Sequence, residues 1–66
     1  MFYVIDKQST SKEKEFTDFN FENVKSSKKA LWHSVEDAAY GISCFIKDFH
    51  AADNSYTKER YEIVEE

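Results

Sequence analysis

Several residues that usually mark turns or fix small folds are scarce in this 66-residue chain. It has no proline, one glycine (Gly41) and one cysteine (Cys44). A single cysteine excludes an internal disulfide and is typical of a reducing, intracellular compartment. One glycine leaves no glycine-rich loop that could hold a phosphate. Turns must therefore come from polar clusters, which occupy residues 6–15, 23–29 and 51–55.

Long apolar runs are also missing. No run approaches the roughly 20 residues that a membrane-spanning helix needs. The first residues, MFYVIDKQ, reach Asp6 after too few apolar side chains to form the core of a signal peptide. We therefore expect a cytoplasmic protein with no membrane partner. A hydrophobic content of 41% with 17% aromatics indicates a single globular domain over residues 1–66.

Basic side chains are in the minority: the chain has 9 Lys and Arg and 13 Asp and Glu, which gives a net charge of −4. Residues 1–33 hold six lysines and five acids (+1), whereas residues 34–66 hold three basic side chains and eight acids (−5). This balance argues against direct nucleic-acid binding, which needs a basic face. It favours a protein partner with a basic surface, with imitation of nucleic acid as one way to bind it. The alternative is that the carboxylates form a solvated face that aids solubility.

Three segments have the pattern of half-buried strands. Residues 1–6 are mostly β-branched and aromatic. Residues 15–24 alternate between polar and aromatic side chains, and residues 56–66 place Tyr61 and Ile63 on one face. We expect each segment to form one strand of a small sheet.

Residues 35–52 instead repeat apolar side chains at the i, i+3, i+4 and i+7 spacing of an amphipathic helix. Ser34 is placed as its N-cap, with Asp37 three residues on. We expect residues 28–33 to enter this helix as an extended segment. The element order β-β-α-β predicts an α+β fold, in which a single helix packs on a small three-stranded, mainly antiparallel sheet. The last strand would lie beside the first, and parallel to it if a right-handed crossover joins them.

Residues of chemical interest gather on this helix, but their spacing does not predict catalysis. Cys44 lies mid-helix, where we expect a buried, inert side chain. The pairs His33–Asp37 and His50–Asp53 lie at opposite ends of a helix about 25 Å long, too far apart to share one metal ion. No nucleophile-elbow or metalloprotease motif occurs. We therefore expect no enzyme activity, no metal and no cofactor.

Four residues near the start of the helix are the candidate partner-binding site: Trp32, Glu36, Asp37 and Tyr40. Tryptophan and tyrosine are favoured anchors of protein interfaces. An aromatic side chain flanked by acids suits a basic partner surface. The alternative for Trp32 is that it packs over the start of the helix and closes the core.

The layout strand–strand–helix–strand, with HSVEDAAYGISCF as the capped helix and RYEIVEE as the returning strand, resembles that of several small phage-encoded inhibitors, among them inhibitors of RNA polymerase. The resemblance and the charge imply a small acidic protein-binding module without catalysis. We expect a phage- or mobile-element-encoded inhibitor of a host protein complex that handles nucleic acid or serves in defence. The alternative is a small structural or regulatory subunit that forms a homodimer through an edge strand, such as residues 15–24. Nucleic-acid binding through Lys25, Lys28 and Lys29 ranks below both.

Overall fold

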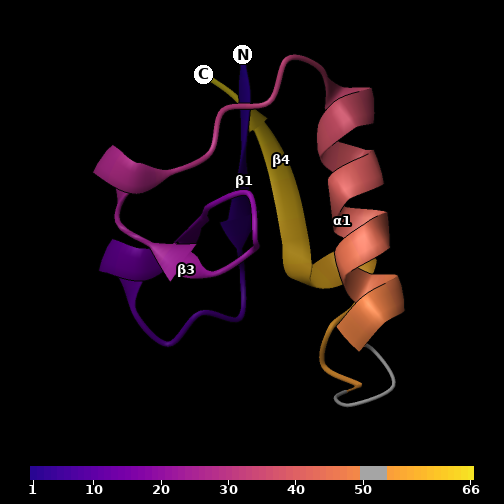
Figure 1. Ribbon diagram of the computed structural model, residues 1–66. Helices are drawn as coiled ribbons and strands as arrows, with labels where there is room; N and C mark the ends of the chain where they lie inside the picture. The colour runs from indigo at the N-terminus through magenta and orange to yellow at the C-terminus, as the bar shows by residue number, and fades with distance from the viewer. Residues whose placement is uncertain (50–53) are drawn as a thin grey trace.

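Within residues 1–49 and 54–66, a four-stranded antiparallel sheet and one helix form two layers (Figure 1). The computed structural model describes residues 1–49 and 54–66. The helix is α1 (Val35–Phe49), and the strands are β1 (Phe2–Asp6), β2 (Phe16–Thr17), β3 (Asn23–Val24) and β4 (Tyr61–Glu65). Single turns of 3₁₀ helix lie at Lys12–Lys14, Ser26–Lys28 and Lys58–Arg60. The α+β class predicted from the sequence is confirmed, but the sheet has four strands in the order β3-β2-β1-β4 rather than three.

The last strand lies beside the first, as predicted, but the parallel arrangement is wrong. β1 and β4 pair antiparallel, from Phe2 opposite Glu65 to Asp6 opposite Tyr61. The reason lies before the helix, where the extended segment carries the chain back to the start of β1. There the Phe2 and Trp32 backbones exchange hydrogen bonds of 2.9 and 2.7 Å. α1 then runs in the direction of β1, so β4 returns against both (Figure 1).

The prediction of one strand over residues 15–24 is also wrong, because this segment folds back on itself. β2 pairs antiparallel with β3, so the chain reverses between Thr17 and Asn23. The two aromatic side chains of the turn consequently point in different directions. Phe21 is 7% exposed and lies in the core, whereas Phe19 is 62% exposed.

The side chain of Asp18 holds this reversal in place. Its Oδ1 accepts the backbone N–H groups of Asn20 (2.9 Å) and Glu22 (3.0 Å). An aspartate that bonds the backbone in this way takes the place of a backbone turn. The reversal puts Phe21 at a φ of 60°, in the left-handed region that bulky residues rarely adopt. We attribute this strained position to the Asp18 bonds together with burial of the Phe21 ring.

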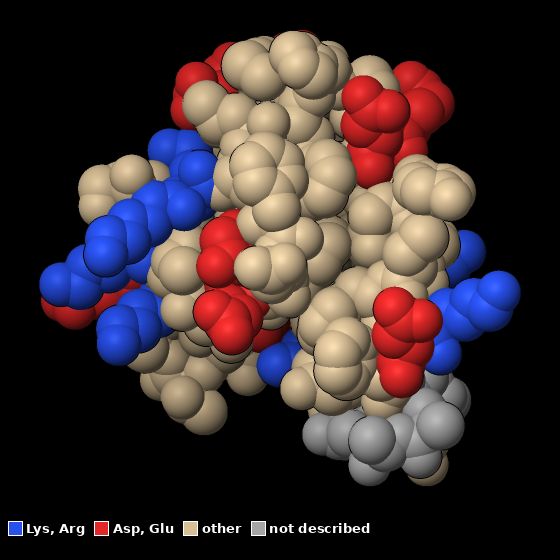
Figure 2. Space-filling model, in the orientation of Figure 1, with Lys and Arg blue, Asp and Glu red and all other residues tan. Residues whose placement is uncertain are grey.

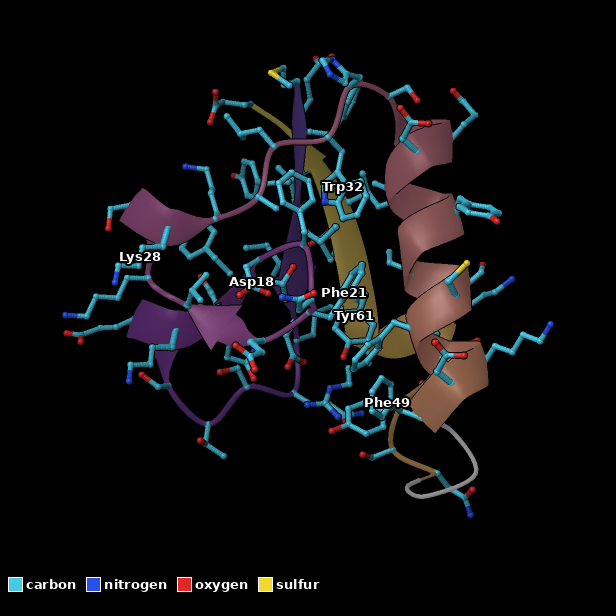
Figure 3. All side chains as sticks on the ribbon, in the orientation of Figure 1. Asp18, Phe21, Lys28, Trp32, Phe49 and Tyr61 are labelled. Atoms are coloured by element: carbon cyan, nitrogen blue, oxygen red, sulfur yellow. The ribbon has the colours of Figure 1, made fainter. Side chains whose placement is uncertain are left out.

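The core lies between α1 and the inner face of the sheet. Figure 3 shows Trp32, Phe21 and Tyr61 filling this space. The Phe21 ring is central, with centroid distances of 5.9 Å to Trp32, 5.1 Å to Phe45 and 5.7 Å to Tyr61. Aromatic pairs of this kind contribute about 0.5–1.5 kcal/mol each beyond the area they bury. The buried aliphatic members are Val4, Ala38 and Ile42.

α1 begins where the sequence predicts. The N–H of Asp37 donates to Ser34 Oγ at 3.0 Å, which is the bond of an N-cap. The described helix ends at Phe49. The predicted continuation through residues 50–52, and with it the pair His50–Asp53, lies outside the described residues.

Gly41 lies directly against the Trp32 ring. A Cβ atom at this position would be 2.6 Å from Cη2 and 3.0 Å from Cζ3 of the indole. Real Cβ atoms do not approach other atoms so closely, so a side chain here must displace the ring. The one glycine of the chain therefore has a packing role: it lets Trp32 lie on the helix.

Gly41→Ala is expected to destabilise the fold. Alanine normally stabilises a helix by about 1 kcal/mol relative to glycine, but here its methyl group overpacks the indole. We expect a net loss of about 1–3 kcal/mol in the free energy of unfolding, measured by urea denaturation. Ser43→Ala, at an exposed position of the same helix, should stay within about 0.5 kcal/mol of the wild type. An alanine variant more stable than the wild type would contradict the packing described.

Asp6 is a buried carboxylate at the end of β1, with 2% of its surface exposed. Arg60 donates from Nε to Oδ1 (2.8 Å) and from Nη2 to Oδ2 (3.0 Å). Asn23 Nδ2 and the backbone N–H of Gln8 donate at 2.9 and 3.0 Å. Burial by itself raises the pKa of this carboxyl, but the bonds from Arg60, Asn23 and Gln8 outweigh it and lower the pKa below 3.8.

Asp6→Asn is expected to remove an acid-sensitive part of the stability. The pKa of Asp6 is lower in the folded state than in the unfolded state, where it is 3.8. The contribution of the ionised carboxylate to the free energy of unfolding is therefore present above pH 3.8 and is lost as the pH falls through the folded-state pKa. At neutral pH the variant leaves Arg60 without its charge partner, which costs about 3 kcal/mol or more. Unfolding by denaturant from neutral pH to acid measures both effects, with exposed Glu13→Gln as the control. Equal acid sensitivity in Asp6→Asn and wild type would count against this assignment.

Candidate protein-binding surface

A groove opens between the β2–β3 turn and α1, with a volume of about 350 Å³. A second hollow of about 390 Å³ continues from it toward Tyr56. We call the two together the aromatic groove. The residues that line it are Phe19, Asn20, Phe21, Glu22, Asn23, Tyr40, Gly41, Cys44, Phe45, Asp48, Phe49 and Tyr56.

Three large rings of the aromatic groove are exposed. Tyr40 is 73% exposed, Phe19 62% and Phe49 48%. Two of them lean on rings that are part of the core or packed against it, because Phe19 meets Trp32 edge-on at 5.0 Å and Phe49 lies 4.8 Å from Phe45. Contiguous exposed apolar surface of this kind marks interaction sites in soluble proteins. Rings already held in place lose little conformational freedom when a partner binds.

The charge around the aromatic groove is negative. Its described lining includes the carboxylates of Glu22 and Asp48 and no lysine or arginine. Asp37 shares a stripe of α1 with Asp48, since the two are eleven residues apart, or about three turns. Figure 2 shows acidic side chains within and beside an uncharged band on this face, with most basic side chains at the margins. Such a surface is complementary to a basic partner.

The structure divides the four residues proposed from the sequence. Tyr40 lines the aromatic groove, and Asp37 lies on the stripe of α1 that borders it. Trp32 is half-buried beneath Phe19 and packs on the helix, which is the core-closing alternative; its Nε1 is buried without a hydrogen-bond partner among the described residues. Glu36 lies about 100° around the helix from Asp37, toward the other flank.

Sequence reasoning missed Phe19, Phe49 and Asp48. The sequence pattern places Phe19 on a face of the strand predicted over residues 15–24, and Phe49 in the apolar stripe of the helix predicted over residues 35–52. The spacing of Asp18 and Asn20, two residues that favour turns, was the signal that could have shown the reversal. With the reversal in place, Phe19 belongs to a turn tip facing α1 rather than to a buried sheet face.

The expectation that Cys44 is buried is wrong, because the thiol is exposed and lines the aromatic groove. The core stripe of α1 includes Ala38, Ile42 and Phe45. Cys44 is two positions from Ile42, about 200° around the helix, and so lies on the opposite side.

Cys44 should therefore react with a thiol reagent in the folded protein. We expect Ellman's reagent to modify it in native buffer at a rate within about tenfold of that in denaturant, since exposure controls access to the thiol. The chain has one cysteine, so the reaction reports on this position alone. Modification only after unfolding would contradict the exposed position.

Of the three lysines proposed as a nucleic-acid contact, Lys29 is held by other groups of the chain, whereas Lys25 and Lys28 are exposed. Lys29 Nζ lies 5.3 and 5.6 Å from the ring centroids of Tyr3 and Phe16 and pairs with Glu66 at 3.5 Å. Lys28 points away from α1, at the far margin of the molecule (Figure 3). This arrangement places Lys29 against the outer face of the sheet, apart from the aromatic groove.

Within residues 1–49 and 54–66, no three His, Cys, Asp or Glu side chains converge as a metal ion requires. No helix in the described part of the chain is long and apolar enough to cross a bilayer. Comparison with models of protein families, with curated proteins and with solved structures gives no match to this chain.

Proposed function

We propose that this chain is a small, non-catalytic module that binds a basic surface of a partner protein through its aromatic groove. The observation that supports this most directly is the combination of three exposed rings, Phe19, Tyr40 and Phe49, with a carboxylate rim that contains no described cation. Aromatic anchors fixed at the centre of a contact supply most of the energy of many interfaces. The surrounding carboxylates would steer a basic partner and fix its orientation.

We further propose that the partner is a host complex that handles nucleic acid or serves in defence, and that the chain is a phage- or mobile-element-encoded inhibitor acting in the cytoplasm. The net charge of −4 supports this, because carboxylates compete with phosphates for a basic cleft. In this role Tyr40 and Asp37 contact the partner, Trp32 supports Phe19 from below, and Glu36 lies at the border of the contact.

Capture from bacterial lysate, followed by titration of the purified partner, tests this function. We expect Tyr40→Ala to weaken binding by at least about 10-fold, as loss of an interface anchor does. Asp48→Lys should weaken it too and make it less sensitive to salt. The partner should also protect Cys44 from modification, because the thiol lies in the aromatic groove.

Lys12→Ala, at an exposed position of the 3₁₀ turn Lys12–Lys14 that does not line the aromatic groove, is the control. It should bind as the wild type does. Equal capture by wild type, Tyr40→Ala and Asp48→Lys would rule out the aromatic groove as the binding surface.

A further inference from the structure

β4 is an edge of the sheet, and no described strand pairs with its outer side. Two backbone hydrogen bonds flank the β1–β4 ladder: Lys7 N–H to the Arg60 carbonyl (2.8 Å) and Glu66 N–H to the Met1 carbonyl (2.9 Å). In an antiparallel ladder, residues alternate between pointing their backbone groups at the neighbour and away from it. The backbone groups of Glu62 and Val64 therefore point to β1, and those of Ile63 and Glu65 point outward.

A groove of about 400 Å³ follows this open edge, between β4 and α1. We call it the edge groove. Its lining from β4 is Tyr61, Glu62 and Ile63, three consecutive residues. Because consecutive side chains of a strand point to opposite faces, a hollow that touches all three follows the edge rather than one face. The remaining lining residues are Lys7, Ala39, Ile42, Ser43 and Lys58.

The charged side chains beside the edge groove change sign from one end of β4 to the other; Glu59, which follows Lys58 and is exposed, does not line the groove. Lys58 precedes the strand and lines the edge groove, together with Lys7. Glu65 and Glu66 end it, and both are exposed. Arg60 does not add to the basic end, since its guanidinium is bonded to Asp6.

The charges along one stripe of α1 change from acidic to basic in the same way. Glu36, Ala39, Ser43 and Lys47 follow one another at spacings of three or four residues, so they share a side of the helix. α1 and β4 run in opposite directions (Figure 1), so the start of the helix lies beside the end of the strand. The acidic ends of both elements therefore coincide, the basic ends coincide, and small or apolar side chains lie between them.

We infer that this edge is the interface with a second copy of the chain, in which two β4 strands pair antiparallel about a two-fold axis at Ile63. The rotation brings the acidic end of each copy onto the basic end of the other. The edge groove is lined by Ile63 of β4 and by Ala39 and Ser43 of α1, so these parts of the strand and the helix lie at the same level. One two-fold axis can therefore pass between the two β4 strands and also between the two α1 helices. Glu36 of one copy then faces Lys47 of the other.

The free backbone groups fit this pairing. The N–H and carbonyl of Ile63 bond the same groups of Ile63 in the second copy. The N–H of Glu65 reaches the carbonyl of Tyr61 in the second copy; the Tyr61 N–H itself is bonded to Lys58 O within its own chain. Glu62 lies opposite Val64 of the second copy and diagonal to its Glu62, which is the one unfavourable contact between these strands.

The charge gradient along β4 also indicates which kind of strand can pair with this edge. A uniformly basic foreign strand would meet Lys7 and Lys58 at one end, and a uniformly acidic one would meet Glu65 and Glu66 at the other. The chain's own β4 carries the gradient that an antiparallel neighbour needs.

Sedimentation equilibrium from about 1 μM to about 1 mM should show a monomer–dimer equilibrium. Glu36→Lys and Lys47→Glu are expected to weaken dimerisation at least about fivefold each, and the double variant to restore it, because the opposite charges then meet again. Glu62→Gln should strengthen dimerisation by removing the repulsion. Tyr40→Ala, in the aromatic groove, should leave it unchanged, and Cys44 should remain reactive in the dimer.

Amide hydrogen exchange supplies a second readout that needs no variant. Protection of the Ile63 amide should increase with protein concentration, whereas the Glu62 and Val64 amides, bonded to β1, should be protected throughout. Glu65→Pro removes an outward N–H that β1 does not use, so circular dichroism should show a folded chain and sedimentation equilibrium a monomer.

A chain that stays monomeric at about 1 mM would overturn the inference, as would a dimer insensitive to the edge variants. Protection of Ile63 only after addition of a lysine–valine repeat peptide would assign the edge to a foreign strand and would equally overturn it. None of these results bears on the aromatic groove, which the Tyr40 and Asp48 variants test separately.

Discussion

The buried ion pair between Asp6 and Arg60 is the interaction on which the arrangement of the chain depends. The two residues are 54 positions apart, and the pair joins the end of β1 to the turn before β4. Asn23 brings the β2–β3 hairpin to the same carboxylate. A buried pair is tolerated only when its polar atoms are bonded, and here each carboxylate oxygen accepts two bonds. In a chain with a single cysteine, this connection joins three parts of the sequence: β1, the β2–β3 hairpin and the turn before β4.

Local patterns predicted the parts of the fold that depend on local chemistry. The strand at Phe2–Asp6 and the start of α1 at Ser34 were both evident, because apolar spacing and an N-cap act within a few residues. The hairpin was missed because a single side chain, Asp18, overrides an alternation that otherwise reads as a strand. The direction of β4 was missed because it follows from the Phe2–Trp32 pairing, which joins residues distant in the sequence.

The same distinction applies to the candidate site. Exposure of Tyr40 follows from its place on the helix, outside the apolar stripe, and was predictable. Phe19 became part of the site only through the reversal at Asp18, and Trp32 became its support only because Gly41 lets the indole lie on α1. The two grooves then lie on different flanks of one helix, with Cys44 on one and Ser43 on the other. Function on one flank is therefore separable from function on the other by substitution.

The hydrogen bond between Glu66 N–H and the Met1 carbonyl, 2.9 Å long, places the first and last residues side by side (Figure 1). A linker of a few residues would close the backbone into a ring without moving either strand. Such a ring loses chain entropy only in the unfolded state, so cyclisation should raise the melting temperature. The same proximity would let these 66 residues be inserted into a surface loop of another protein with both grooves open.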